Sequence, residues 1–265
     1  MRLCLSPVAE RLLDSFSADG TQQLARDAGA TVVERRFTNY ADQKNWGLDN
    51  LPFTGDWIFI LDADERLTPA LRDEIRAKTA RNRGIHGYYI NRVVIFMGKP
   101  IRHGGLYPSW NLRLFRRGSA RYEERTVHEH MACSGPTDYM HAEMLHIRRE
   151  SLSRYLEKHI RYADLESEEW VKWRLGESTM GAPASLFKDV LAMRQWIRRN
   201  IWPRVPGRPL WRFMYMFFFR FGFMDGLPGW HLARLMACYE YMIGLLYKEK
   251  LQRLSERSEV RDVHR

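Results

Sequence analysis

The feature that most constrains the fold is an alternation of short apolar runs and helix-like segments over the first 80 residues. Apolar runs lie at residues 12–13, 31–34 and 57–61, and helix-like segments follow them at residues 22–28, 39–50 and 69–80. Gly29 and Pro69 fit helix ends, since Gly commonly ends a helix and Pro commonly begins one. Strands that alternate with helices form a sheet with helices on its faces. We therefore predict an α/β fold with a mostly parallel sheet flanked by helices.

The rest of the chain predicts a helical C-terminal region. Apolar and polar residues alternate as in strands from Gly87 onward, and later apolar residues recur at helical spacing. We predict one domain over residues 1–147 and a helical region over residues 148–265, with apolar helices at 210–247. These are either core helices or helices that lie in a membrane interface. We expect the second arrangement, with the basic residues 194–212 contacting anionic lipid.

The net charge favours anionic partners. The chain of 265 residues has 42 Lys and Arg against 32 Asp and Glu, a net charge of +10. It shows no zinc-finger, helix-turn-helix or RNA-binding signature, so no nucleic-acid partner is expected. Three widely separated cysteines favour a reducing compartment over a disulfide framework. The N-terminus lacks signal-peptide features, and no apolar run reaches the ~20 residues of a membrane span, so a cytoplasmic location is expected.

Carboxylates gather directly after the apolar run at residues 57–61. Asp62, Asp64 and Glu65 stand within four residues, and like charges this close need a compensating base, water or metal ion. Ligands of open α/β sheets bind at the carboxyl ends of strands, and Mg²⁺ is commonly held by one or two carboxylates plus substrate phosphates. The segment predicts that Asp62 and Asp64 hold a metal ion and a diphosphate. The alternative is a solvated turn in which Asp64 or Glu65 caps the next helix.

Two other interpretations fit less well. Haloacid-dehalogenase-type phosphatases also place Asp-x-Asp after an apolar strand, but they usually need Thr or Val where this chain has Arg66. Four histidines between His128 and His146, together with Cys133, offer zinc ligands, but their spacing is not that of a usual structural zinc site.

Several motifs in one order resemble glycosyltransferase family 2, the inverting enzymes of the GT-A fold. They are "DSFSADGT", "GATVVERRF", "QKN" and "WIFILDADERL" in the first third of the chain, and "VHE" further on. The stretch from "GYYINRVVIF" to "RTVHEH", and the later "RFGFMDGLPGWHLARLMACYEY", are similar to the branch that contains lipopolysaccharide-core glucosyltransferases. The resemblance spans residues 12 to about 247 and implies a Rossmann-like, metal-dependent hexosyltransferase.

The resemblance also implies roles for individual residues. Asp62 and Asp64 would hold Mg²⁺ or Mn²⁺ with the diphosphate. The remaining donor-binding residues are expected to be Asp14, Gln43, Lys44, Asn45, Arg113 and Arg125. The "VHE" motif makes Glu129 the expected catalytic base, which takes a proton from the acceptor hydroxyl. Glu124 is the second candidate, because it can instead pair with a neighbouring arginine.

The function implied by the resemblance is transfer of a sugar from a nucleotide-sugar donor, expected to be a UDP-sugar, to a cell-envelope glycan or lipid-linked acceptor such as lipopolysaccharide core. The expected location is the cytoplasm, peripheral on the inner face of the cytoplasmic membrane. Family members begin with a further apolar strand, whereas only 13 residues precede Asp14, so this strand is expected to be missing. The alternative is therefore a catalytically impaired, truncated member that acts as a membrane-bound scaffold.

Overall fold

The computed structural model describes residues 10–81, 84–123, 131–147, 151–176, 193, 196–197 and 200–263, with side chains as far as residue 256. The chain divides into two compact units. One consists of Met1–Val93 with Pro108–His146, and the other of Val94–Tyr107 with Ile147–Arg265. The predicted domains, 1–147 and 148–265, stay a prediction.

The first unit begins with a small parallel sheet. Strand β1 (Arg11–Asp14) pairs in parallel with β2 (Thr31–Glu34), and α1 (Thr21–Asp27) connects them. Gly20 precedes α1 with a φ of 78°, a backbone conformation that Gly adopts without steric cost. This β-α-β arrangement is the one that the sequence predicts for these residues.

A six-stranded sheet has the order β3-β7-β5-β10-β4 with β6 beside β5, and β6 and the last residues of β5 belong to the second unit. Its strands are β3 (Trp57–Phe59), β4 (Glu65–Leu67), β5 (Gly87–Phe96), β6 (Lys99–Ile101), β7 (Trp110–Arg116) and β10 (Thr137–Ile147). The pairs β3–β7, β5–β7, β4–β10 and β5–β6 are all antiparallel, so the prediction of a mostly parallel sheet is wrong for them. β5 and β6 show the reason most directly, because only Met97 and Gly98 join them, whereas parallel strands need a crossover of about a dozen residues.

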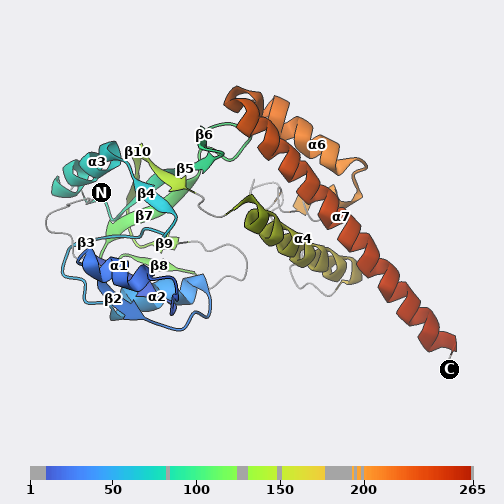
Figure 1. The fold of residues 1–265 in the computed structure, drawn as a ribbon, viewed down its shortest axis with the longest axis horizontal. Coiled ribbons are helices and arrows are strands. Elements are labelled where there is room, and N and C mark those ends of the chain that lie inside the picture. The colour runs from blue at the N-terminus through green and yellow to red at the C-terminus, as the bar shows by residue number, and fades with distance from the viewer. Residues whose placement is uncertain are drawn as a thin grey trace. The chain divides into compact units, whose positions relative to one another are not determined.

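Helices cover both faces of this sheet, which confirms the α/β class (Figure 1). On one face α3 (Pro69–Ala80) inserts Leu71, which is fully buried among Ile90, Leu114 and Met144. On the other face α2 (Tyr40–Asn50) packs with the β8–β9 hairpin, Ala120–Tyr122 and Met131–Cys133. Because two apolar layers enclose the sheet, the ends of its strands are held in fixed positions.

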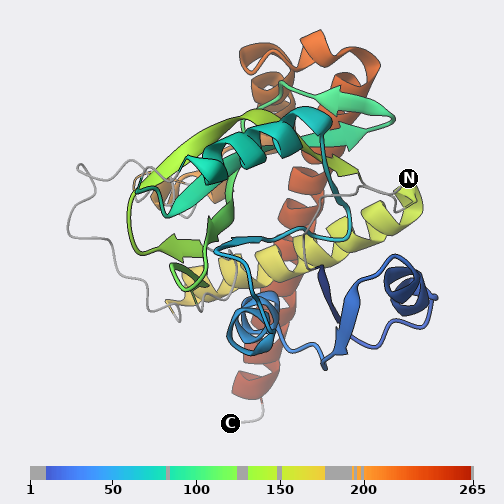
Figure 2. The ribbon, with the colours of Figure 1, turned by 90° about the vertical axis from the view of Figure 1, so that its left-hand side faces the viewer.

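The second unit is built around two long helices, α4 (Leu152–Leu175) and α7 (Gly226–Val263), which lie side by side (Figures 1 and 2). Ala163 and Trp170 of α4 pack with Ile243 of α7. Four short helical elements also lie in the described part of this unit: η1 (Trp202–Arg204), α6 (Arg208–Met214), η2 (Tyr215–Phe219, a π-helix) and η3 (Gly222–Asp225). None of the helices in the described part of the chain is long and apolar enough to cross a membrane.

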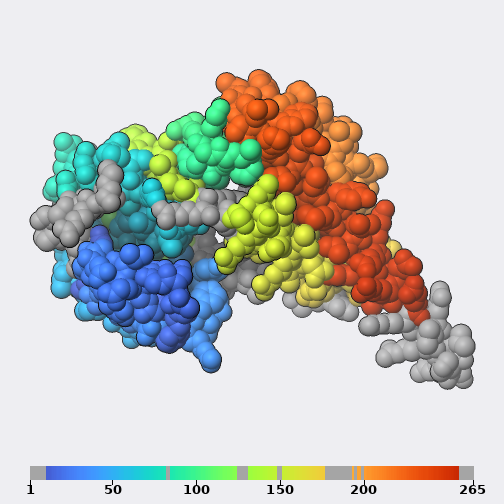
Figure 3. Space-filling view, in the orientation of Figure 1, coloured from blue at the N-terminus to red at the C-terminus, as the bar shows by residue number. Residues whose placement is uncertain are grey.

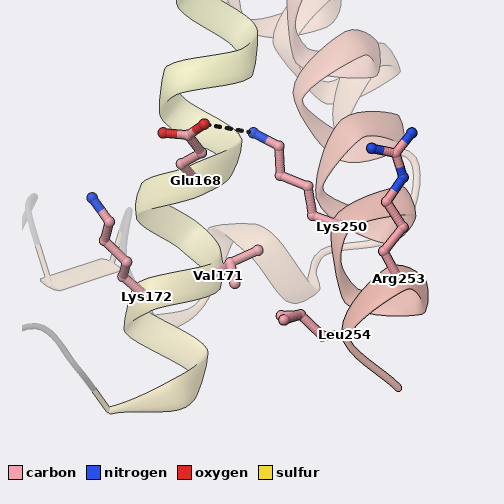
Figure 4. Close-up of a pocket in the computed structure, with 6 residues that line it drawn as sticks. All are labelled: Glu168, Val171, Lys172, Lys250, Arg253 and Leu254. Carbon is pink, nitrogen blue, oxygen red and sulfur yellow. Dashed lines mark ion pairs between the residues drawn. The ribbon is translucent and has the colours of Figure 1, made fainter. Parts of the chain in front are cut away.

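The short elements carry many exposed apolar side chains, and α6 with the start of α7 forms the orange surface in Figure 3. Elsewhere in this unit, α4 and α7 enclose a groove of about 330 Å³ (Figure 4). Its lining residues are Glu168, Val171, Lys172, Lys250, Arg253 and Leu254. Lys250 closes one side by pairing with Glu168 at 3.3 Å. None of the predicted site residues lines this groove.

Candidate active site

The three carboxylates after β3 differ in their exposure to solvent. Asp62 and Asp64 lie in the turn between β3 and β4, and their side chains are 34% and 49% exposed. Glu65 is the first residue of β4, and its side chain is 0% exposed. Its backbone N–H donates to the carbonyl of Asp62 at 2.9 Å and closes the turn. We call residues 61–64 the acidic loop; two of the three carboxylates can therefore meet a solvent-borne ligand.

Two cations compensate Asp62. Arg113 Nη2 donates to Asp62 Oδ2 at 2.6 Å, and Lys44 Nζ lies 3.2 Å from Oδ1. Burial alone would raise the pKa of Asp62, but Arg113 and Lys44 outweigh it and hold the pKa below its ordinary value. Asp62 is therefore ionised at neutral pH.

Glu65 shares the same arginine from the buried side. Arg113 Nη2 donates to Glu65 Oε1 at 2.5 Å, and the backbone N–H of Asp62 donates to Oε2 at 2.9 Å. Arg92 Nη1 lies 3.7 Å from Oε1. Burial raises the pKa of Glu65 despite these cations. For Arg113, burial opposes the charge, but the two carboxylates prevail and raise its pKa.

A β-bulge aims Arg113 at this cluster. β7 pairs with β5 so that Tyr88 lies opposite Leu114 and Tyr89 opposite Leu112, and the register skips Arg113. An extra residue in one strand is left out of the ladder and can point its side chain in a new direction. Arg113 is 5% exposed and holds both carboxylates, so its predicted contact with the donor stays a prediction.

Asp64 is the more accessible carboxylate of the predicted metal pair. Its Oδ1 lies 3.4 Å from His146 Nδ1, which is its ion-pair partner in the described part of the chain. The described residues contain no group of three or more His, Cys, Asp or Glu that could hold a metal ion. Mg²⁺ commonly uses only one or two carboxylates with substrate phosphates, so the hard oxygen donors of Asp64 and Asp62 fit such an ion.

Three neighbouring residues of α2 face different parts of the site. Lys44 pairs with Asp62 and lies 5.0 Å from the centre of the Tyr122 ring. Gln43 Nε2 donates to Ser15 Oγ at 3.1 Å, whereas the buried Gln43 Oε1 has no hydrogen-bond partner among the described residues. Asn45 exchanges two hydrogen bonds of 2.9 Å with the backbone of Tyr122, so its amide holds β8.

Asp14 closes the turn that follows β1. Its carboxylate accepts hydrogen bonds from Ser17 N at 2.8 Å, Ser17 Oγ at 2.6 Å and Gln22 Nε2 at 2.8 Å. Burial would raise the pKa of Asp14, but these donors outweigh it and lower the pKa. Asp14 thus shapes the turn beside Ser15, which Gln43 contacts.

The structure brings together Lys44, Asp62 and Arg113 in one network, with Asp64 beside it and Gln43 on the same helix as Lys44. Glu124, Arg125 and Glu129 lie outside the described residues, so their predicted roles stay predictions. Sequence reasoning missed the buried role of Glu65 and missed Arg92; it considered His146 only as a zinc ligand and not as a partner of Asp64. A signal for Glu65 exists, because Glu65 and Leu67 alternate on one face of a strand and Leu67 packs against the core.

Comparison with known proteins bears on the same part of the chain. The model of the family described as "Glycosyl transferase family 2" matches residues 11–140, which include Asp14, the acidic loop and Arg113. The "Lipopolysaccharide core biosynthesis glycosyltransferase LpsC" of Rhizobium meliloti (strain 1021) is 28% identical over 198 residues, which are 72% of this chain and 72% of that protein.

Two shorter matches are to uncharacterized glycosyltransferases of Rickettsia. RP128 of Rickettsia prowazekii (strain Madrid E) is 30% identical over 89 residues, which are 33% of this chain and 30% of that protein. A protein of Rickettsia felis (strain ATCC VR-1525 / URRWXCal2) is 39% identical over 64 residues, 24% of this chain and 22% of that protein. The chain therefore matches less than a third of the length of these two relatives.

Proposed function

Because residues 11–140 are a glycosyl transferase family 2 domain, we propose that the chain is an inverting glycosyltransferase. It moves a hexose from a nucleotide-sugar, expected to be a UDP-sugar, to a cell-envelope glycan or lipid-linked acceptor such as lipopolysaccharide core. The observation that carries the proposal is the acidic loop, in which Asp62 is held ionised between Lys44 and Arg113 while Asp64 stays open to solvent. The similarity to LpsC supports the class of acceptor.

Donor binding is proposed along α2 and the acidic loop. Gln43 lies next to Lys44 on this helix and donates to Ser15 Oγ beside the turn of Asp14, where the resemblance to the family implies the nucleoside. Lys44 supplies a cation close to the position proposed for the diphosphate. Asp64, with Asp62 beside it, would hold Mg²⁺ or Mn²⁺. A bound metal ion would neutralise the charge that develops on the leaving diphosphate.

The proposed chemistry is a single displacement. The acceptor hydroxyl loses its proton to a carboxylate and its oxygen forms a bond to the anomeric carbon, while the bond to the nucleoside diphosphate breaks. Attack opposite the leaving group inverts the anomeric centre. Glu129 is the proposed base and Glu124 the second candidate; both assignments rest on the resemblance of the "VHE" segment.

The proposed place of action is the inner face of the cytoplasmic membrane, with residues 210–230 in contact with lipid. Exposed apolar side chains in this segment are Leu210, Trp211, Tyr215, Phe218, Phe219, Phe221, Phe223, Met224, Leu227 and Trp230. Between residues 200 and 234 the sequence has five arginines and one acidic residue, Asp225. Asp225 accepts hydrogen bonds from the backbone of Arg102 and His103 and its side chain is 5% exposed. Arg208 is buried as well, so the other four arginines supply the positive charge near this segment.

The proposed lipid-binding surface, residues 210–230, includes fewer residues than the apolar helices 210–247 that the sequence predicts to contact the membrane. Leu232, Ala233 and Ile243 of α7 are buried in the cores of the second unit. Much of the segment from 231 to 247 therefore serves as core, which was the other interpretation of the sequence. An exposed aromatic surface with basic neighbours suits an anionic lipid interface, to which each such charge adds about 1 kcal/mol.

Acceptor-dependent release of UDP tests the proposed function. The purified chain is given UDP-glucose or another UDP-hexose with Mn²⁺ and a lipopolysaccharide-core acceptor, and UDP is measured with and without acceptor. Release that needs the acceptor supports a transferase. If no UDP-hexose and core acceptor give release while the chain is folded and binds UDP, the scaffold alternative replaces it.

A further inference from the structure

We propose that Glu65 is a positioning residue of the proposed sugar transfer, which fixes Asp62 and the acidic loop through Arg113 and through the backbone of Asp62. The inference rests on the proposed function for what the loop binds. It concerns a residue that cannot reach a ligand directly, because its side chain is 0% exposed.

The contacts of Glu65 form a closed ring. Glu65 Oε2 accepts from the backbone N–H of Asp62, and Glu65 Oε1 accepts from Arg113 Nη2. The same nitrogen donates to Asp62 Oδ2. One carboxylate thus restrains both the main chain and the side chain of Asp62. Asp62 Oδ1 is left facing Lys44, so the ring also sets where that cation lies.

Burying the charged carboxylate of Glu65 costs folding free energy, which a purely structural residue would not need to spend. A buried carboxylate loses its hydration, and an apolar side chain of similar size commonly stabilises such a position at least as well. Here two features maintain the charge: the bulge that aims Arg113 inward, and Arg92 at 3.7 Å. Pre-orienting groups that bind a diphosphate is the gain that offsets this cost, because small misplacements in a site reduce binding and rate.

Glu74 is a matched control in the same unit. Its carboxylate accepts hydrogen bonds from the backbone N–H groups of His141 and Ala142, at 2.8 to 3.0 Å, and its side chain is 17% exposed. It therefore resembles Glu65 in restraining backbone from a largely buried position. Its hydrogen-bond and ion-pair partners in the described part of the chain are His141, Ala142 and Lys78, and not Asp62 or Arg113. Glu74→Gln therefore reports on lost stability alone.

The test compares Glu65→Gln with Glu74→Gln in three measurements: thermal unfolding, hydrogen exchange of the peptide over residues 58–66, and titration with UDP and Mn²⁺. Both variants are expected to unfold at a lower temperature. Only Glu65→Gln is expected to speed exchange in the peptide and to weaken UDP binding, by about 10-fold to 100-fold. In the transfer assay the donor KM should rise more than kcat falls.

A double-variant cycle separates positioning through Asp62 from a general effect. If Glu65 acts through Asp62, Glu65→Gln weakens UDP binding less in the Asp62→Asn background than in the wild type, because only the bond to the backbone of residue 62 is then left to lose. Additive effects, or a Glu65→Gln variant that behaves as Glu74→Gln does, would overturn the proposal. If Glu65→Gln does not fold, Glu65→Asp keeps the charge and shortens the reach by one methylene, with the same expected changes. The exchange measurement needs no substrate, so it separates failure of this inference from failure of the proposed transfer.

Discussion

At the scale of single residues, Asp62 and Asp64 of the acidic loop lie in different electrostatic environments. Both oxygens of Asp62 are engaged by cations, whereas Asp64 is half exposed beside His146. The two substitutions should therefore differ in kind. Loss of Asp62 leaves the buried Arg113 with one fewer partner, and loss of Asp64 removes a solvent-facing carboxylate.

Asp64→Ala is expected to abolish metal-dependent transfer and to change the free energy of unfolding by less than about 0.5 kcal/mol, because the side chain is exposed. UDP release is measured against Mn²⁺ concentration and in EDTA, and stability by urea denaturation. Asp73→Ala, which removes an exposed carboxylate paired with Arg72, is the control and should keep full activity. Unchanged turnover in EDTA would contradict the proposed metal dependence.

Glu129→Gln is expected to keep UDP binding and to slow transfer by about 10²–10⁴-fold, since the amide keeps the shape but cannot take a proton. Transfer and UDP binding are measured on the same preparation. A variant with nearly wild-type transfer would move the role of base to Glu124, and Glu124→Gln is the parallel measurement.

Asp14 gives a prediction about pH. Its pKa in the folded chain lies below the ordinary value of 3.8, so its ionised form adds stability above that pH and the contribution disappears as pH falls through the folded pKa. The melting temperature of Asp14→Asn should lie furthest below that of the wild type near neutral pH, and the gap should narrow below about pH 4. Thermal unfolding across this range checks it; a gap that widens in acid would contradict the assignment.

At the scale of secondary structure, the residue that caps α3, Thr68, also bonds to a strand of the sheet. Thr68 Oγ1 accepts from Leu71 N at 3.1 Å and donates to the carbonyl of Glu143 in β10 at 2.9 Å. The cap therefore both begins the helix and ties it to the strand that pairs with β4.

Thr68→Ala is expected to lower the free energy of unfolding by about 1–2 kcal/mol, since it removes both the cap and the bond to β10. Thr79→Ala is the control in the same helix, because Thr79 Oγ1 donates to the carbonyls of Ile75 and Arg76 within α3 and does not tie the helix to a strand. Ala also has a high helix propensity. Urea denaturation of the two variants measures the difference. Equal losses would mean that the cap contributes nothing beyond helix propensity.

Local signals explain what could be predicted at this scale. The elements between residues 11 and 80 agree with the predicted segments closely except for β4, which was not predicted. Gly29, Asn39, Thr68 and Pro69 mark helix ends in the sequence itself. Strand direction depends on partners far along the chain: β3 pairs with β7, so Phe59 lies opposite Leu114. The bulge at Arg113 likewise depends on how β7 is aligned with β5, and no residue type in the sequence predicts it. Sequence reasoning therefore found Arg113 and Asp62 but not the buried Glu65 that Arg113 also holds.

At the scale of the whole molecule, the exposed surface of residues 210–230 gives a prediction about lipid binding. The chain should sediment at low salt with vesicles that contain phosphatidylglycerol, and less with phosphatidylcholine vesicles, because attraction to anionic lipid adds to apolar burial. Phe219→Ser with Leu227→Ser should weaken this binding by about 10-fold or more.

Tyr241→Ser with Leu245→Ser is the matched control, because these side chains are 61% and 55% exposed, close to the 67% and 72% of Phe219 and Leu227, but lie further along α7. It should keep vesicle binding within about twofold. Equal loss in both double variants would contradict a localised lipid contact. If the wild type stays in the supernatant as a dimer that Phe219→Ser with Leu227→Ser dissociates, the surface joins two copies of the chain instead.

The bracing of Asp62 by Arg113 also bears on how the domain is synthesised. The two residues are 51 positions apart, and Arg113 and Glu65 are 48 apart. A nascent chain that has released only β1 to α3 already carries Lys44, Asp62 and Glu65, yet it lacks the arginine that holds the two carboxylates. Non-local contacts of this kind form late, once intervening loops have closed. A ribosome-bound chain ending before β7 should therefore fail to retain UDP on a nucleotide column, and retention should begin only after β7 has emerged and paired.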